Sequence, residues 1–298
     1  MDAVQSVQPI YSLAGFAVGL LVGLTGVGGG SLMTPILILL FGIHPAAAVG
    51  TDLLYAAATK TAGSLVHGYN RTVDWGVVRR LATGSVPATV LTIAALSFVN
   101  LNGPLARELI AGLLTIALFL TAMALVFRER IVDRYASRVG QLSEQRVASL
   151  TIAVGAVLGV LVSISSVGAG AIGVTALILL YPKLPTARIV GSDIAHAVPL
   201  TLVAGIGHWI MGSTDWQLLG VLLIGSLPGI AIGSYCAVRV PETALRLLLA
   251  AILIVVAGRL GAEQWRSAAP NLAAVTVRAA APGAPLVVPI AVGVRPAN

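Results

Sequence analysis

The chain has 298 residues, of which 57 % are hydrophobic and 10 % are charged, and its mean hydropathy is +0.97. A soluble protein carries about a quarter charged residues, so this composition excludes a sizeable soluble domain and indicates a polytopic membrane protein. The net charge of +7 does not indicate nucleic-acid binding. Most basic residues lie in short segments beside hydrophobic stretches, where they orient a membrane protein.

Six segments are suited to simple spanning helices, because a span needs about 20 apolar residues. They lie at about 46–68, 76–98, 107–127, 189–210, 217–238 and 243–262.

Two further segments, 10–41 and 149–181, are too long for one straight span and carry small residues in the middle. Each glycine in the run Gly28 to Gly30 costs about 1 kcal/mol in a helix relative to alanine. We therefore expect the first segment to break there and to continue as a half-helix from Ser31 to Phe41. Such a break persists within a membrane only where protein or a water-filled cavity surrounds it.

The second half of the chain repeats the first at an offset of 140 and then 141 residues. Gly19 to Ser31 returns as Gly159 to Ala171, and Gly50-Thr51-Asp52 returns as Gly191-Ser192-Asp193. Further matches are His67 with His208, Asp74-Trp75 with Asp215-Trp216, and Gly84 to Pro87 with Gly225 to Pro228. We interpret the chain as two transmembrane repeats at 10–127 and 148–263, joined by a cytoplasmic linker at 128–147 and followed by a tail at 264–298.

The basic residues favour opposite orientations for the two repeats. Loop 69–80 holds three arginines, whereas its repeat mate 211–216 holds none. If each broken segment enters the membrane and returns, every repeat has three full spans, and this odd number inverts the second copy. The sequence thus predicts an all-α fold with an inverted pseudo-two-fold. The alternative, in which both broken segments cross, differs by placing Arg259 and Arg266 inside rather than outside.

These residues resemble the TauE/SafE family of sulfite exporters. The resemblance rests on the run Gly26 to Pro35 (GVGGGSLMTP), on the Gly-Thr-Asp of the next helix and on the duplicated layout, and it covers about 10–263. It implies a secondary carrier of small sulfur-containing anions such as sulfite, thiosulfate or organosulfonates. The second motif departs from the pattern, reading Val167 to Gly173 (VGAGAIG), so the two half-sites are expected to differ.

The two helix breaks predict an anion site. A helix that starts at Ser31 or Ala171 presents free N–H groups and about half a positive charge from its dipole. Two such ends facing each other would hold an anion near the membrane midplane. The residues expected to line this site are Gly28, Gly29, Gly30, Ser31, Thr34, Thr51, Ser165, Ser166, Gly168, Gly170 and Ser192. The alternative is that these small residues serve only close helix packing.

Lys60 is the most informative single residue, because it lies in the middle of segment 46–68. An ionisable group at that depth is costly and usually functional. The ammonium can bind a sulfonate or sulfite oxygen, or it can exchange a proton and couple transport to pH. The alternative is a structural pair with Asp52 or Asp193. The repeat mate of Lys60 is Thr201, so only one half-site carries this charge.

Asp52 and Asp193 are expected in the first turn of their helices, where a carboxylate caps free N–H groups. His196 lies deeper, at the position that matches Tyr55, and is a further candidate for proton coupling together with Lys60, Asp52 and Asp193. The four histidines and the single Cys236 show no metal-ligand spacing, and no cofactor or nucleophile motif is present.

The sequence therefore predicts an alternating-access carrier in the bacterial cytoplasmic (inner) membrane, not an enzyme. Its expected partners are a small anion and the lipid bilayer, and no nucleic acid. A homodimer is compatible with the sequence, because lipid-facing and subunit-facing apolar surfaces look alike. The alternatives are an anion channel and a carrier coupled to protons or cations through Asp52 and Asp193.

Overall fold

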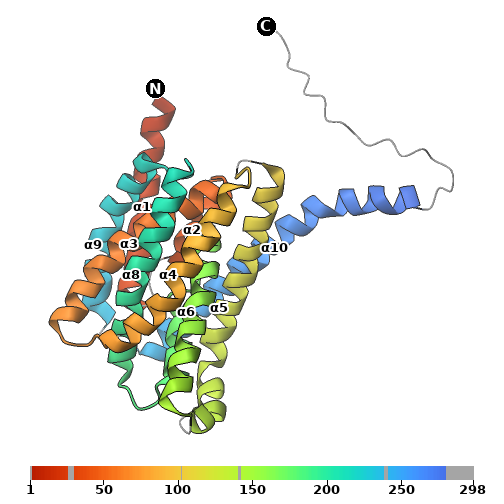
Figure 1. Ribbon diagram of the computed structural model, residues 1–298. Helices are drawn as coiled ribbons and strands as arrows, with labels where there is room; N and C mark the ends of the chain where they lie inside the picture. The colour runs from red at the N-terminus through yellow and green to blue at the C-terminus, as the bar shows by residue number, and fades with distance from the viewer. Residues whose placement is uncertain (1, 26–29, 102, 140–141, 238–240, 280–298) are drawn as a thin grey trace.

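The computed structural model describes residues 2–25, 30–101, 103–139, 142–237 and 241–279, and every regular element within these ranges is an α-helix (Figure 1). This confirms the predicted all-α class. In chain order the helices are α1 (Asp2–Thr25), α2 (Gly30–Leu39), α3 (Pro45–Tyr69), α4 (Trp75–Ser97), α5 (Pro104–Val139), α6 (Glu144–Ser165), α7 (Ala171–Leu180), α8 (Thr186–Ile210), α9 (Trp216–Ala237) and α10 (Glu242–Ala279).

Five described helices are long and apolar enough to cross a membrane. Four of them contain predicted spans, and the fifth, α6, is the first part of a segment that we expected to be broken. α3 and α4 have 25 and 23 residues, which suffices for a span, but they are less apolar. The five stretches are Ala106–Tyr135, Glu144–Ser165, Thr186–Ile210, Trp216–Gly233 and Thr243–Arg266.

Two short helices follow the expected breaks. α2 begins at Gly30 and α7 begins at Ala171, and each has 10 residues, or about 15 Å of helix. Gly28 and Gly29 lie outside the described residues. In the second break, Gly168 and Gly170 have φ angles of 119° and 130°, a region that favours glycine because a Cβ is strained there.

Each short helix folds back beside the helix that precedes it. The hydroxyls of Thr151 in α6 and Tyr181 at the end of α7 are 2.8 Å apart. In the first half, the rings of Tyr11 in α1 and Phe41 after α2 have centroids 4.6 Å apart. These two contacts occupy corresponding positions in the sequence. Both hairpins are therefore closed at the base, and their breaks lie deeper than the base by about the 15 Å length of the short helix.

Helices at matching positions in the two halves run antiparallel. Residue numbers rise along α3 where they fall along α8, and the same holds for α5 and α10. The contacts that establish these directions are Leu54 with Gly205 and Gly63 with Ile194 for α3 and α8, and Thr115 with Gln264 and Glu129 with Arg246 for α5 and α10.

Glycine brings α1 against α9 and α4 against α6. A Cβ added to Gly225 would collide with the backbone carbonyl of Ser12, and one added to Gly84 would collide with that of Ile152. The two contacts again occupy corresponding positions. Small residues that let helix backbones touch are the usual means of association in membranes, where burial from water gives no driving force.

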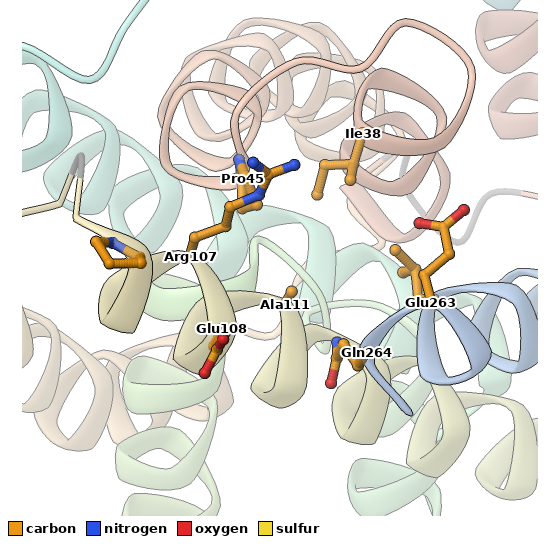
Figure 2. A pocket seen from close by; sticks show the side chains of 9 residues that line it. Ile38, Pro45, Arg107, Glu108, Ala111, Glu263 and Gln264 are labelled. Carbon is orange, nitrogen blue, oxygen red and sulfur yellow. The ribbon is translucent and has the colours of Figure 1, made fainter. Parts of the chain in front are cut away.

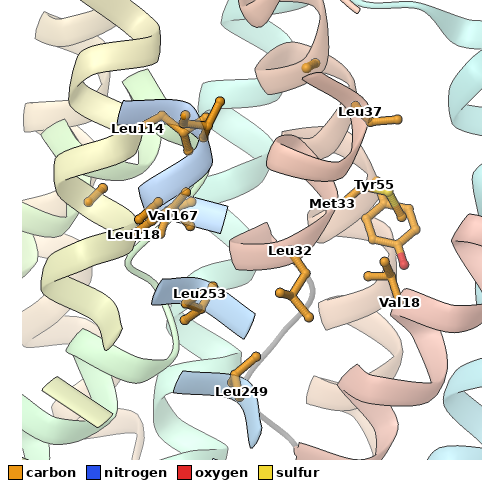
Figure 3. Packing of buried hydrophobic residues seen from close by; sticks show 14 of the residues in the cluster. Val18, Leu32, Met33, Leu37, Tyr55, Leu114, Leu118, Val167, Leu249 and Leu253 are labelled. Carbon is orange, nitrogen blue, oxygen red and sulfur yellow. The ribbon is translucent and has the colours of Figure 1, made fainter. Parts of the chain in front are cut away.

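The largest apolar cluster joins α1, α2, α3, α5, α9 and α10 (Figure 3). Met33, Tyr55, Leu114 and Leu253 are fully buried within it, and Val167 adds a side chain from the second break. The loop between α6 and α7 is thus fixed by packing on α5 and α10 as well as by its own glycines.

Two helices continue beyond the predicted boundaries. α5 runs to Val139 through most of the predicted linker 128–147, because residues 128–139 include four arginines and neither glycine nor proline, so nothing in this stretch breaks a helix. α10 runs to Ala279, past the predicted tail boundary at 264, and its last part leaves the bundle (Figure 1).

We expect Gly225→Ala and Gly84→Ala each to lower stability by about 1–3 kcal/mol, because a methyl group would force apart two touching backbones. The midpoint of thermal unfolding in detergent measures this. Gly220→Ala is the matched control in α9, since a Cβ there meets no atom within 4 Å. Equal midpoints for Gly225→Ala and Gly220→Ala would contradict the packing argument.

Candidate functional site

Lys60 connects α3 to the second helix break. Its side chain is only 6 % exposed, and its Nζ donates a hydrogen bond of 3.2 Å to the carbonyl oxygen of Ala169, between α6 and α7. Two separate sequence predictions, the buried lysine and the broken helix, therefore meet at one point. An ammonium has three N–H donors, and the described residues accept from one of them.

Two buried carboxyl groups act electrostatically on Lys60. Asp52 is fully buried, Asp193 is 2 % exposed, and both attract the ammonium. Within the described part of the chain neither comes within the 4 Å of a direct ion pair. One cation thus lies between two potential anions in an interior where unpaired charge is costly.

The prediction that Asp52 and Asp193 cap the first turn of their own helices is wrong. α3 starts at Pro45 and α8 at Thr186, so both aspartates lie about two turns inside. Asp52 instead binds the start of α2. Its Oδ2 accepts hydrogen bonds from the backbone N–H of Thr34 at 3.2 Å and from the Thr34 hydroxyl at 2.5 Å.

Asp193 has no corresponding support. The residue that matches Thr34 in the second repeat is Val174, which has no hydroxyl. The carboxyl group lies directly over Gly173 in the first turn of α7, where a Cβ would collide with Oδ1. Among the described residues no hydrogen bond to Asp193 exists, and Oδ1 is a buried atom without a partner. The two carboxyl groups therefore differ: Asp52 accepts hydrogen bonds from Thr34, and Asp193 accepts none within the described residues.

A second matched pair lies beside the aspartates. His196 Nε2 and Ser85 Oγ are 2.8 Å apart, which joins α8 to α4. At the corresponding positions, Tyr55 in α3 approaches Ser226 in α9, but neither hydroxyl makes a hydrogen bond within the described residues. His196 is fully buried and feels the charge of Lys60, so it belongs to the same cluster.

Unpartnered polar atoms concentrate at this centre. Of nine such buried side-chain atoms in the described residues, six belong to residues linked to Lys60 directly or through Asp52. Polar atoms in protein interiors are nearly always paired, so these atoms together form a polar centre suited to water or to a polar ligand. The six atoms are Asp52 Oδ1, Tyr55 Oη, Ser166 Oγ, Asp193 Oδ1, His196 Nδ1 and Ser226 Oγ.

Three predicted site hydroxyls are used elsewhere. Thr51 Oγ1 accepts from the backbone N–H of Asp215 at 3.0 Å, and Ser192 Oγ accepts from that of Asp74 at 2.8 Å. Ser165 Oγ accepts from the backbone N–H of Val167 and shapes the break locally. The remaining predicted residues lie at or beside the breaks: Thr34, Ser166, Gly168 and Gly170. Gly30 and Ser31 form the start of α2. The side chain of Ser31 lies outside the described residues.

Sequence reasoning missed Tyr55, Ser85 and Ser226 as members of the cluster. Ser85 and Ser226 stand in the repeated runs Gly84 to Pro87 and Gly225 to Pro228, so their recurrence was a usable signal. Tyr55 was noted only as the mate of His196. The sequence alone does not distinguish a tyrosine or serine that belongs to a polar site from one that only packs against neighbouring helices.

Two pockets lie away from this centre. One, of about 420 Å³, is lined by the end of α2, the middle of α10 and the starts of α3 and α5, with Arg107 near Pro45 and Glu263 across from it (Figure 2). The other, of about 290 Å³, lies near the far end of α5 and includes Glu129 and Arg246. Burial and then Arg107 lower the pKa of His44, in the turn before α3. Neither pocket contains a predicted site residue.

Long apolar helices around a buried lysine, two buried carboxyl groups and a broken helix define an integral membrane protein with the features of a transporter. The model of one family, the sulfite exporter TauE/SafE family, matches residues 11–260. The chain belongs to this family of membrane transporters.

Three similar proteins are also described as probable membrane transporters. The chain is 39 % identical over 244 residues to the probable membrane transporter protein YjnA of Bacillus subtilis, covering 82 % of this chain and 95 % of that one. It is 27 % identical to the probable membrane transporter protein YdhB of the same organism, over 78 % and 91 % of the two chains. It is 25 % identical to the probable membrane transporter protein MJ0441 of Methanocaldococcus jannaschii, over 82 % and 92 %. No solved structure matches.

We expect Thr34→Val to destabilise the protein by about 1–3 kcal/mol, because it removes the hydroxyl donor of a fully buried carboxyl group. The midpoint of thermal unfolding reports the loss. Thr175→Val is the control, since the buried Thr175 hydroxyl bonds only to the carbonyl of Ala171 in its own helix. If both variants unfold at the same temperature, the contact between Thr34 and Asp52 contributes nothing measurable.

Proposed function

We propose that this protein is a secondary transporter that moves a small sulfur-containing anion across the bacterial cytoplasmic membrane by alternating access. The observation that carries the proposal is Lys60, a buried ammonium that contacts a helix break and has N–H donors to spare. The physical argument leads to a small anion, and family membership adds the sulfur: sulfite, thiosulfate or an organosulfonate.

The anion would bind between Lys60 and the broken helices. The start of α7 directs free N–H groups and the positive end of its dipole toward the break that Lys60 contacts. Ser166 Oγ is buried at the same break, where it approaches the Asp52 carboxyl group without making a hydrogen bond within the described residues. A fixed cation, backbone N–H groups and a hydroxyl together suit the oxygen atoms of a sulfite or sulfonate group.

Burial of the centre supports alternating access. Lys60, Asp52, Asp193, His196 and Ser166 are each at most 6 % exposed, so solvent reaches the proposed site from neither end. An anion can enter only if helices move, and the break loops and short helices are the natural moving parts. An anion channel, the alternative from the sequence, would differ by showing flux that does not saturate.

An inverted repeat is supported by the antiparallel course of α3 with α8 and of α5 with α10. The charges agree with the proposed orientation. Arg80 pairs with Glu144 at 3.0 Å and donates to Tyr181 at 3.3 Å, while Arg188 pairs with Asp74 at 3.5 Å. These contacts gather the basic segments 69–80, 128–147 and 182–188 at one end, which we assign to the cytoplasm. The broken segments then enter and leave the membrane on the same side.

A carrier coupled to cations through Asp52 and Asp193 is the second candidate, because two buried carboxyl groups flank one lysine. The two candidates make opposite predictions for Lys60. The anion carrier requires the ammonium, whereas the cation carrier would gain from its removal.

We expect purified protein in proteoliposomes to show saturable flux of labelled sulfite, inhibited by thiosulfate or an organosulfonate, and Lys60→Met to lower that flux at least tenfold. The reason is that the variant removes the charged partner of the anion but keeps an unbranched apolar chain of similar length. Lys183→Met, at the other lysine of the chain, is exposed in a loop and should retain wild-type flux.

Three results would overturn the anion carrier. The first is wild-type flux in Lys60→Met. The second is flux proportional to concentration without saturation. The third is no flux of sulfite, thiosulfate, sulfoacetate, methanesulfonate, sulfate or formate by folded protein.

We expect Asn70→Cys and Met211→Cys, each in a Cys236→Ser background, to react with a membrane-impermeant maleimide from opposite sides of the membrane. These residues are repeat mates in the turns before α4 and α9, so inversion puts Asn70 inside and Met211 outside. Labelling of intact and permeabilised cells distinguishes the sides. Reaction of both from one side would reject the inverted arrangement.

A further inference from the structure

The two carboxyl groups at the centre differ in how they are held, although they occupy matching positions. Asp52 accepts two hydrogen bonds from Thr34, whereas the described residues give Asp193 none. We propose that Asp193 carries one proton with each transported anion, while Asp52 is a fixed part of the contact between α2 and α3. This inference rests on the proposed anion transport and specifies its coupling.

The coupling arises because the anion and the Asp193 carboxylate compete for the same cation, Lys60. With the site empty, the Asp193 carboxylate compensates the Lys60 ammonium, which acts on it from α3. An anion that binds Lys60 replaces that compensation and leaves a buried carboxylate with no partner. An unpaired charge is strongly disfavoured in a buried position, so the anion binds together with a proton that neutralises Asp193. By linkage, the proton favours anion binding to the same extent.

Few other titratable groups of the described residues face Asp193. α7 has no charged residue, and the charged residues of α6, Glu144 and Arg146, lie at its far end. The groups that face this part of α8 are Lys60, Asp52 and His67 from α3, Asp74 of the α4 cap, which is paired with Arg188, and His196 of α8 itself.

Each transport cycle takes up one proton on one side of the membrane and releases it on the other. A proton from water binds the Asp193 carboxylate and forms an O–H bond, and the anion binds Lys60. After the site opens to the other side, the anion leaves, the O–H bond breaks, and the proton passes to water. The carboxylate then compensates Lys60 again. The result is symport of one proton per anion, which is electroneutral for a monovalent anion.

The test separates exchange from net transport in proteoliposomes. Exchange of labelled for unlabelled anion at equal pH needs no proton movement, whereas accumulation driven by a pH gradient does. The probes are thiosulfate and methanesulfonate, which bind no proton themselves near neutral pH, and entrapped pyranine reports protons that enter with them. For Asp193→Asn we expect exchange within about threefold of wild type, accumulation at least tenfold lower, and no proton entry.

Two further variants examine the roles of Asp52 and Asp193 separately. Asp52→Asn should lower exchange and accumulation by the same factor, together with the unfolding temperature, because it disturbs a fixed contact. Val174→Thr places a hydroxyl at the position that matches Thr34. It should hold Asp193 and lower accumulation several-fold more than exchange, which tests the idea even if Asp193→Asn does not fold.

The outcomes distinguish this inference from the proposed function. Absence of wild-type flux for every anion would remove both. Anion flux with proton entry retained in Asp193→Asn, or uncoupling in Asp52→Asn instead, would overturn only the role of Asp193. Flux of sulfite without flux of either strong-acid anion would also overturn it, because the proton would then travel on the substrate.

Discussion

The main constraint on this structure is that the ionisable side chain of Lys60 is buried in an apolar interior, where a charge is costly. Lys60 is buried and makes no direct ion pair with either nearby carboxyl group within the described residues, and its contact with the carbonyl oxygen of Ala169 depends on the interruption between α6 and α7. An unbroken helix would use that carbonyl in its own ladder of hydrogen bonds. The break and the two aspartates can each be understood as support for that one buried group.

The sequence predicted the features that depend on local chemistry. The breaks follow from glycine-rich runs, and the central lysine follows from a charge in the middle of an apolar segment, so the starts of α2 and α7 fell within a residue of expectation. The roles of Asp52 and Asp193 were misjudged because capping depends on where α3 and α8 begin. The predicted span 46–68 begins within one residue of α3, so it already placed Asp52 nearly two turns inside the helix and spoke against capping.

Other parts of the centre could not be predicted, because they depend on how distant helices pack. The pairing of His196 with Ser85 and the approach of Tyr55 to Ser226 each join residues of different helices that are far apart in the chain. Thr51 and Ser192 had the right residue types and positions, yet their hydroxyls bind the loops before α9 and α4. Nothing local to those helices distinguishes the two kinds of hydroxyl.

The glycine contact between α1 and α9 also has a consequence for synthesis. Ser12 lies against Gly225, so the first helix cannot meet its partner until more than 200 further residues have been made. At about 5–20 residues per second, that delay is on the order of 10–40 s. The matching contact of α4 with α6 joins Gly84 to Ile152 and completes far sooner. During biogenesis the N-terminal helix therefore waits with its partner face uncovered, and its insertion has to be stable without that partner.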